Sequence, residues 1–394
     1  MSDLKAADVA PAPGSDAVAT GILTIDLDAI VSNWRKLEKT AVPAECGAAV
    51  KADAYGCGID PVVRALARAG CKTFFVATLD EARAARTAAP EAAIYLLNGL
   101  LQSPGDALAA INVQPVIGDL NEYAEWEAFR RYSGWRGGAA IHVDTGMNRL
   151  GFSVADAQAM VPRIAGGNHG VTLVMSHLAC ADSLNHPLNA RQAHAFREIA
   201  HHFSGVPASL ANSAGIFLGP SFQFDLVRPG AALYGVNPTP EAANPMLPVI
   251  DLKARIVQVR QIARGDSVGY GASWVARRAT RIAIVAAGYA DGYFRAAGSS
   301  DGSRGAEVVV AGKRCPVAGR VSMDLLAVDI TDVPAEASRR GQLVTLIGDG
   351  ITVDELAHHY GTIGYEVLTS LGRRYQRIYK GGDEPAAKAQ PTLQ

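Results

Sequence analysis

Short apolar runs alternate with amphipathic stretches through the first part of the chain. The runs have the length and composition of buried strands, and apolar residues recur with a helical period between them. We expect strands near residues 46–51, 73–77, 93–97, 113–117, 139–143, 171–176, 208–211 and 224–227. We expect helices at 28–39, 60–69, 79–88, 119–131, 153–165 and 188–203. Asp28 or Thr24 is the expected cap of the first helix, and Asp119 of the fourth.

Eight strands that alternate with helices over about 200 residues predict a (β/α)₈ barrel of the TIM type. A doubly wound open sheet is the alternative. Eight repeats favour closure of the sheet, and no GxGxxG sequence opens a helix after the first strand.

The pattern changes after about residue 248. Segments 252–262, 280–287, 307–310, 325–330 and 342–347 are apolar and β-branched, and Gly, Asp and Pro turns separate them. This pattern predicts a mostly antiparallel β domain, with a helix near 353–360 and a strand near 373–379. The expected organisation is a disordered tail at 1–20, a barrel at 21–248, a β domain at 249–380 and a flexible tail at 381–394.

Composition narrows the class of protein. The 394 residues are 49% hydrophobic and 19% charged, with a net charge of -1, which favours neither nucleic acid nor a membrane surface. Residues 1–20 lack the basic start and apolar core of a signal peptide. Five unevenly spaced cysteines form no CxxC pair and indicate reduced thiols in a cytoplasm. His201-His202 and His358-His359 lack metal-binding spacing, so we expect no metal site.

Lys51 ends the first expected strand, and small residues and glycines follow it directly. A lysine at the end of a buried strand is unfavourable unless a partner or a reaction needs it. Desolvation lowers the pKa of a lysine, and the neutral amine can form a Schiff base with an aldehyde. Lys51 therefore suggests a cofactor that carries a carbonyl group.

Polar residues also follow other expected strands, at the end where a barrel builds its active site. Loops are wet, so one polar residue there would mean little, but six strands followed by such residues favour a functional site. These residues are Lys51, Asn98, Asp144, His177, Asn212 with Ser213, and Arg228.

A phosphate site is indicated after the last two strands of the barrel. The sequences Asn212-Ser213-Ala214-Gly215 and Arg228-Pro229-Gly230-Ala231 follow strands seven and eight. Barrels often bind phosphate in these loops, and small residues let backbone N–H groups approach the anion. Two ordinary turns are the alternative reading. An aldehyde and a phosphate on one rim describe pyridoxal 5′-phosphate (PLP).

The chain resembles the alanine racemases, PLP enzymes built from a barrel and a β domain. The resemblance covers the chain from about residue 21 to about residue 380. Seven strings in the order of that family carry it: AVKADAYG (49–56), HVDTGMNRLG (142–151), MSHL (175–178), VRPG (227–230), GYGA (269–272), GYADG (288–292) and SMD (322–324).

The resemblance implies how the cofactor is bound. Lys51 would hold PLP covalently, and Arg228 would face the pyridine nitrogen. An arginine keeps its proton at ordinary pH, so it donates to that nitrogen and leaves it unprotonated. The ring is then a weaker electron sink, which we expect to suppress transamination. Tyr55, Ser213, Gly230, Ala231 and Tyr365 would bind the phosphate, and His177 and Asn212 complete the expected cofactor site.

Racemisation needs proton transfer on both faces of the substrate Cα. By resemblance, Lys51 acts on D-alanine and Tyr270 acts on L-alanine, with His177 as the hydrogen-bond partner of Tyr270. Tyr270 would come from the other subunit of a head-to-tail homodimer with shared active sites. Met323 would arrive in the same way and bind the substrate carboxylate through its N–H group.

Arg149 would steer the phenol oxygen and the carboxylate, and Tyr289 would narrow the entrance. One position departs from the family. At His142 many members carry a lysine that becomes carbamylated and orients Arg149. A histidine cannot form that carbamate, so a chloride, Asp144 or a neighbouring carboxylate must orient Arg149.

The implied function is PLP-dependent interconversion of L- and D-alanine in a bacterial cytoplasm, supplying D-alanine for peptidoglycan. A broad-specificity racemase of this fold is the first alternative, although such enzymes are commonly exported. A PLP decarboxylase of basic amino acids is the second, although decarboxylation needs no tyrosine base. A non-catalytic PLP-binding protein is the third, although those tend to be barrels alone.

Overall fold

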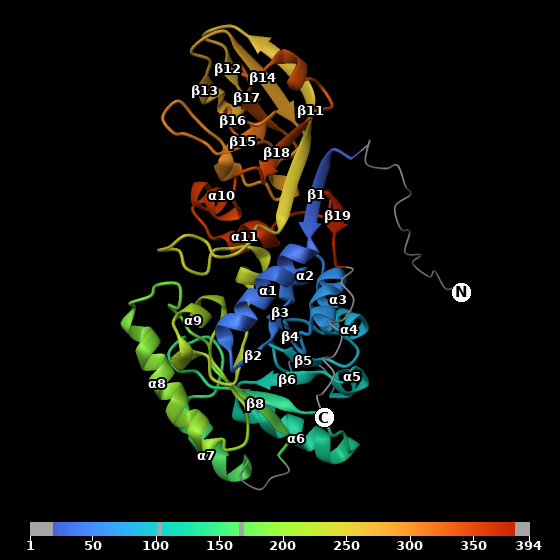
Figure 1. Ribbon diagram of the computed structural model, residues 1–394, viewed down its shortest axis with the longest axis vertical. Helices are drawn as coiled ribbons and strands as arrows, with labels where there is room; N and C mark the ends of the chain where they lie inside the picture. Colours follow the sequence, from blue (N-terminus) through green and yellow to red (C-terminus); the bar gives the residue numbers. More distant parts are fainter. Residues whose placement is uncertain (1–18, 101–104, 165–168, 383–394) are drawn as a thin grey trace, which may run out of the picture. The chain divides into compact units, whose positions relative to one another are not determined.

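The computed structural model describes residues 19–100, 105–164 and 169–382, and Figure 1 labels their elements. The described residues form two compact units. The barrel unit comprises residues from 25 to 249 together with 363–369 and 379–382. The β unit comprises residues 19–24, 250–362 and 370–378.

The barrel unit is built on a ring of short parallel strands. Its strands are β2 (Glu45–Cys46), β3 (Ala48–Ala49), β4 (Thr73–Val76), β5 (Ala93–Leu96), β6 (Gln114–Ile117), β7 (Ala139–His142), β8 (Val171–Met175), β9 (Ala208–Ser209) and β10 (Leu226–Val227). Strands β3 to β9 pair in chain order, and β10 pairs with β2. Only Gly47 separates β2 from β3, so the two are parts of one strand.

Two backbone hydrogen bonds close the ring between β9 and β10. Asp225 N–H donates to Ala208 O at 3.0 Å, and Arg228 N–H donates to Ala211 O at 2.9 Å. With β2 and β3 counted as one, the described residues form eight parallel strands around a closed ring. The predicted barrel is confirmed, and the open sheet is excluded.

Helices surround this ring (Figure 1). They are α1 (Leu27–Ala41), α3 (Ile59–Ala69), α4 (Leu79–Ala88), α5 (Gly105–Ala110), α6 (Leu120–Ser133), α7 (Val154–Ile164) and α8 (Pro187–His202). Shorter turns are α2 (Lys51–Tyr55), α9 (Ser213–Phe217), α11 (Gly364–Thr369), η2 (Pro220–Phe222) and η3 (Ala231–Tyr234). None of the helices in these described ranges is long and apolar enough to cross a membrane.

The N-caps predicted for two helices can be compared with the structure. Asp119 caps α6 as expected, accepting from the N–H groups of Asn121 and Glu122. The expected cap of α1 was wrong, because Asp26 accepts from Ala29 N–H at 2.8 Å rather than Asp28 or Thr24. Helix α1 begins one residue earlier than the pattern suggested, so the capping position moves back along the chain.

The interior of the ring is filled by side chains from successive strands. One buried cluster takes a residue or two from most of the strands, which is how barrels of this class fill their centre. Its members are Ala49, Phe75, Tyr95, Val116, Ala140, Leu173, Met175 and Leu226. The barrel is therefore a packed core, and its chemistry lies at the ends of the strands.

The β unit is mostly antiparallel, as predicted. Its strands are β1 (Gly21–Asp26, whose last two residues belong to the barrel unit), β11 (Ile250–Ile262), β12 (Ser267–Val268), β13 (Trp274–Val275), β14 (Thr280–Val285), β15 (Glu307–Val310), β16 (Lys313–Pro316), β17 (Leu326–Asp329), β18 (Leu343–Ile347) and β19 (Gln376–Lys380, ending in the barrel unit). The main sheet runs β16-β15-β18-β11-β1-β19, with β14 between β11 and β17.

Helix α10 (Val353–Tyr360) and the turns η4 (Tyr270–Ala272), η5 (Tyr289–Asp291), η6 (Arg295–Ala297) and η7 (Ala335–Ala337) complete the β unit. Strand β1 is a finding that the sequence did not predict. It lies between β11 and β19 in the sheet order, and these strands are more than 200 residues away along the chain. Local periodicity cannot reveal a pairing of that range.

Candidate active site

Lys51 follows Val50 at the end of β3, on the rim of the barrel. Val50 N–H donates to Phe75 O at 2.9 Å, so the ring of strands holds the backbone up to the residue before the lysine. The Lys51 side chain is half-buried. Burial lowers the pKa of its amine, the charge of Arg149 lowers it further, and Glu81 opposes them. A larger neutral fraction makes the amine a better nucleophile.

A left-handed turn follows Lys51 and was not predicted. Ala52, Asp53, Ala54 and Tyr55 have φ values between 53° and 55°. A residue with a Cβ loses roughly 1–2 kcal/mol in this conformation, because the Cβ crowds the backbone. Such a run persists only where its surroundings hold it in place. The strained turn connects the rim lysine to Tyr55.

Glu81 is a residue that sequence reasoning missed, and it contacts this turn. Its Oε1 accepts from Ala52 N–H at 2.7 Å and from Asp53 N–H at 3.4 Å. Its Oε2 accepts from Ala77 N–H at 2.8 Å and from Thr78 N–H at 3.2 Å. Thr78 and Glu81 also form the capping box of α4. The Thr-x-x-Glu signature of a capping box is visible in the sequence at Thr78 and Glu81. It does not predict that Glu81 also binds the loop after β3.

Ser213 organises the backbone at the start of η3. Its Oγ accepts from Gly230 N–H at 2.9 Å and from Ala232 N–H at 3.2 Å. Asn212 caps α9 by accepting from Gly215 N–H at 2.9 Å, which fixes the turn that carries Ser213. The loops after β9 and β10 therefore meet, and two amide donors of the second loop converge on one oxygen atom of the first. Converging donors of this kind suit a phosphate.

Tyr55 borders this group of atoms, which we call the cradle: Ser213 Oγ with the N–H groups of Gly230 and Ala232. Its ring stacks on Tyr234 with centroids 4.7 Å apart, and the ring of Tyr365 lies 6.1 Å away. A Cβ on Gly230 would clash with the Tyr55 hydroxyl, so only glycine lets the loop approach this phenol. Burial raises the pKa of Tyr55, which therefore stays a neutral hydrogen-bond donor. A hydroxyl donor beside converging amides fits the phosphate of PLP.

Arg228 is buried at the end of β10. Nη1 donates to Ser209 Oγ at 2.5 Å, and Nη2 donates to the backbone oxygens of Ser176 at 2.6 Å and Leu210 at 3.4 Å. Burial lowers the pKa of the guanidinium, yet arginine stays protonated at neutral pH. Among the residues that the structure describes, its acceptors are neutral. This buried cation fits the unprotonated ring nitrogen of PLP, to which it can only donate.

His177 and His142 are kept neutral near this cation. Burial lowers the pKa of His177 well below its usual value, and Arg228 adds to the shift. Burial and then Arg228 lower the pKa of His142 to about 4. Arg228 Nη2 lies 3.4 Å from His177 Nδ1 and can only donate, so we assign the ring proton of His177 to Nε2.

Arg149 lies on a loop that folds back on strand β7. Phe152 N–H donates to His142 O, and Asp144 N–H donates to Phe152 O, both at 2.8 Å. Asp144 Oδ1 accepts from the N–H groups of Gly146, Met147 and Asn148 at 2.8, 2.9 and 3.1 Å. Burial would raise the pKa of Asp144, but these bonds outweigh it and lower the pKa. Asp144 thus shapes the loop, and no carboxylate in the described part of the chain pairs with the exposed Arg149 within 4.0 Å.

Three expected site residues belong to the β unit and are exposed there. Tyr270 is 70% exposed, Met323 54% and Tyr289 44%. Segment 320–323 joins the turns that carry them. The Arg320 side chain packs beside Gly271, while Tyr289 N–H donates to Ser322 O at 3.1 Å and Ala290 N–H donates to Met323 O at 3.0 Å.

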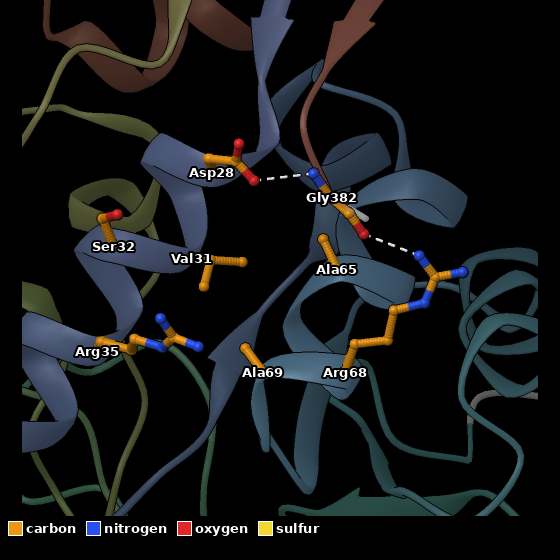
Figure 2. Close-up of a pocket in the computed structure, with 8 residues that line it drawn as sticks. All are labelled: Asp28, Val31, Ser32, Arg35, Ala65, Arg68, Ala69 and Gly382. Carbon is orange, nitrogen blue, oxygen red and sulfur yellow. Dashed lines mark hydrogen bonds between the residues drawn. The ribbon is translucent and has the colours of Figure 1, made fainter. Parts of the chain in front are cut away.

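The pocket in Figure 2 holds none of these residues. It lies between α1 and α3 and is lined by Asp28, Val31, Ser32, Arg35, Ala65, Arg68, Ala69 and Gly382. Gly382 N–H donates to Asp28 Oδ1 at 2.9 Å, and Arg68 Nη1 donates to Gly382 O at 2.8 Å (Figure 2). These contacts anchor the segment after β19, which is a structural role.

Comparison with known proteins identifies the family. Residues 25–238 match the family model "Alanine racemase, N-terminal domain", and residues 249–379 match "Alanine racemase, C-terminal domain". An alanine racemase of Methylobacterium sp. (strain 4-46) is 52% identical over 357 residues, which are 91% of this chain and 97% of that protein.

Two further relatives differ in the role that their names give. The biosynthetic alanine racemase of Agrobacterium fabrum is 45% identical, covering 92% of this chain and 94% of the relative. The catabolic one of Mesorhizobium japonicum is also 45% identical, covering 94% and 96%. A crystal structure of alanine racemase from Bartonella henselae with covalently bound pyridoxal phosphate has a TM-score of 0.86 and 38% identity, covering 92% of this chain and all of that one. This chain belongs to the alanine racemase family.

Proposed function

We propose that this chain interconverts L-alanine and D-alanine with PLP. One observation carries the proposal: Lys51, the hydrogen-bonded pair Ser213 and Gly230, and buried Arg228 all follow strands on the same rim of the barrel, where Ala49 N–H donates to Pro229 O at 2.8 Å. A carbonyl acceptor, a phosphate and an unprotonated ring nitrogen are what these three features fit, and PLP supplies all of them. When bound, PLP withdraws electrons from the substrate Cα and so makes its proton acidic.

The cofactor residues are proposed as follows. Lys51 is the covalent anchor, and Arg228 faces the pyridine nitrogen. The phosphate is bound by Ser213, Gly230 and Ala231 together with the phenols of Tyr55 and Tyr365. Asn212 supports this site by capping α9, and His177 supports it beside Arg228.

Arg228 also limits the reaction. A guanidinium donor leaves the ring nitrogen unprotonated, which weakens the electron sink and disfavours transamination. Arg228→Glu should therefore raise the ratio of transamination to racemisation, and we expect this even as kcat falls. Pyruvate formed per turnover measures that ratio. A ratio equal to that of the wild type would contradict this role of Arg228.

Two groups move the proton. Lys51 Nζ takes the α-proton of D-alanine while the Tyr270 hydroxyl delivers one to the opposite face, and L-alanine reverses both transfers. A phenol has a reference pKa near 10. A hydrogen bond from neutral His177 Nε2–H would stabilise the phenolate and make Tyr270 a usable base. A positively charged histidine is not required, which agrees with the lowered pKa of His177.

We further propose a head-to-tail homodimer that shares its active sites. Tyr270, Tyr289 and Met323 are exposed in the single chain, as residues that complete a partner's site would be. Arg149 and the Met323 N–H group would bind the substrate carboxylate, and Tyr289 would narrow the entrance around the methyl group. We place the enzyme in the bacterial cytoplasm, with D-alanine for peptidoglycan as its product and neither nucleic acid nor membrane as a partner.

One experiment tests the reaction. Purified protein, PLP and L-alanine are mixed in deuterated water, and the α-proton and optical activity are followed together. We expect exchange of the α-proton with loss of optical activity. Release of carbon dioxide, or no exchange, would overturn the proposal. The same assay with lysine, arginine and serine measures how strictly the enzyme selects alanine.

A further inference from the structure

One carboxylate ties two loops of the barrel together at the start of α4. Glu81 accepts from Ala77 and Thr78 N–H in the loop after β4, and from Ala52 and Asp53 N–H in the loop after β3. The first pair lies directly before α4, the helix that carries Glu81. The second pair belongs to the left-handed turn after Lys51, 29 residues earlier in the case of Ala52.

The barrel contains a second copy of this arrangement. Glu122 Oε2 accepts from Gly118 N–H at 2.7 Å, and Glu122 Oε1 accepts from Leu100 N–H at 2.6 Å. Glu81 and Glu122 each stand four residues after the N–H group that they bind in their own loop. Each also stands three residues after the cap of its helix, which is Thr78 for α4 and Asp119 for α6. Both glutamates are half-buried.

The two copies differ in what the second oxygen holds. Glu122 holds the backbone of Leu100, which carries no functional side chain, and Glu81 holds a run of four residues with positive φ. A run of this kind is not stable by itself, because each of its residues prefers a conformation with negative φ. Its first two amides point to the Glu81 carboxylate, and Lys51 immediately precedes them.

We propose that Glu81 is a positioning residue for Lys51, fixing the left-handed turn that aims the lysine amine. The inference rests on the proposed function of Lys51. It assigns to Glu81 a task beyond capping α4, and it assigns no such task to Glu122. Glu81 touches neither cofactor nor substrate in this proposal, because its effect passes through the Ala52 and Asp53 amides.

Charge adds a second route to the same lysine. Arg149 and Glu81 are the charged groups that shift the pKa of Lys51, Arg149 lowering it and the negative Glu81 raising it, and Lys51 in turn helps to lower the pKa of His177. Replacing Glu81 with a neutral side chain should lower the pKa of the Lys51 amine further. Replacing Glu122 should leave that pKa unchanged.

The test compares Glu81→Gln with Glu122→Gln and with Thr78→Ala. Glutamine keeps only one acceptor oxygen. In Glu81→Gln the N–H groups of one of the two loops therefore face the side-chain NH₂ group and lose their acceptor. Glu122→Gln makes the same chemical change at the matched position. Thr78→Ala weakens the cap of α4 while leaving the Glu81 carboxylate in place.

Two readouts use the protein without cofactor. Hydrogen exchange should show the amides of Ala52 and Asp53 exchanging roughly tenfold faster in Glu81→Gln, as expected for loss of a charge-assisted hydrogen bond. The pH dependence of Lys51 acylation should move to lower pH in this variant. In Glu122→Gln and Thr78→Ala both readouts should match the wild type at residues 51–53.

The third readout is the kinetics of the loaded enzyme. Glu81→Gln should lower kcat by roughly 10- to 100-fold with a smaller change in KM, as for a displaced catalytic group. If Glu81→Gln matches Glu122→Gln in exchange, acylation and kcat, the positioning role is overturned. If Glu81→Gln does not fold, Glu81→Asp decides, and wild-type exchange and acylation in that variant would overturn the role. A wild type that fails the deuterium assay would instead overturn the proposed function.

Discussion

The rim of the barrel unit and the turns of the β unit contribute to the proposed site in different ways. On the rim, Lys51, His177 and Arg228 are wholly or partly withdrawn from water, and their pKa values are shifted within the single chain. In the β unit, Tyr270, Tyr289 and Met323 are largely exposed. The rim is therefore prepared by folding of one chain, while the β-unit residues lack the surroundings that catalysis requires. The difference favours a site completed by a second subunit.

Lys51→Ala should produce the largest effect, because it removes both the proposed covalent anchor and one of the two proposed bases. We expect kcat to fall by roughly 10⁴- to 10⁶-fold. The absorbance of covalently bound PLP should disappear as well, and a spectrum unchanged from the wild type would contradict the assignment. Circular dichroism is the control for folding.

Tyr270→Phe should remove proton transfer on one face only. Racemisation should fall by roughly 10²- to 10⁴-fold, which is the usual contribution of an acid or base. Lys51 remains, so D-alanine should still exchange its α-proton with deuterated water and keep its configuration. Loss of exchange together with racemisation would show that Tyr270 serves both faces.

Mixing the two variants sharpens the comparison between units. Random pairing of Lys51→Ala and Tyr270→Phe subunits yields mixed dimers in about half of the molecules, each with one intact site if sites are shared. About one quarter of wild-type activity should then return. No recovery under conditions where subunits exchange would place Tyr270 in the site of its own chain.

His142→Asn should change how acid affects the stability of the cofactor-free protein. In the folded chain the pKa of His142 is about 4, below the usual 6.5, so the unfolded chain binds its proton more readily. The wild type should lose roughly 1.4 kcal/mol of unfolding free energy per pH unit from this residue as pH falls from 6.5 towards 4.

Urea titrations at pH 7.5, 6 and 5 measure how the free energy of unfolding depends on pH. In His142→Asn this dependence should be weaker by the contribution of His142. His359→Asn is the matched control, since His359 is exposed on α10 of the β unit. An equal change of slope in both variants would mean that the rim is not specially sensitive to acid.

Arg374→Met should produce the smallest effect. Arg374 Nε binds Asp291 Oδ1 at 2.5 Å and Nη1 binds Asp324 Oδ1 at 2.8 Å, joining the turns that carry Tyr289 and Met323. Loosening these turns should raise KM for alanine by roughly two- to fivefold with little change in kcat. Arg278→Met, which breaks a pair with Asp332 alone, should leave KM unchanged. A fall in kcat at constant KM would contradict this view of Arg374.

Local sequence patterns were enough to predict most of the strands and helices. Each strand that the sequence predicted is found within a few residues of its expected position, because each is a short apolar run bounded by turns, whereas β1, β12, β13 and β16 were not predicted. Lys51 was recognisable from the sequence as a charge at the end of such a run, and its lowered pKa agrees with that argument. The roles of Lys51 and of the other site residues stay predictions.

Features that depend on contacts between distant parts of the chain could not be predicted from the sequence. Strand β1 pairs with β11 and β19, and the second loop bound by Glu81 lies 29 residues before it. The left-handed turn contains no glycine between Ala52 and Tyr55, so nothing in its composition predicts positive φ. In each case the cause is a contact between distant parts of the chain, which periodicity does not record.

The return of residues 363–369 to the barrel unit has a consequence for biosynthesis. The ring of Tyr365 lies 6.1 Å from that of Tyr55, and Gly56 packs against the backbone of Leu368. During translation the strands of the barrel are complete by residue 227, yet this wall of the cradle leaves the ribosome about 140 residues later. A nascent chain paused between these points would present Lys51 and its turn without Tyr365. If Tyr365 binds the phosphate as proposed, full loading with PLP would await synthesis of nearly the whole polypeptide.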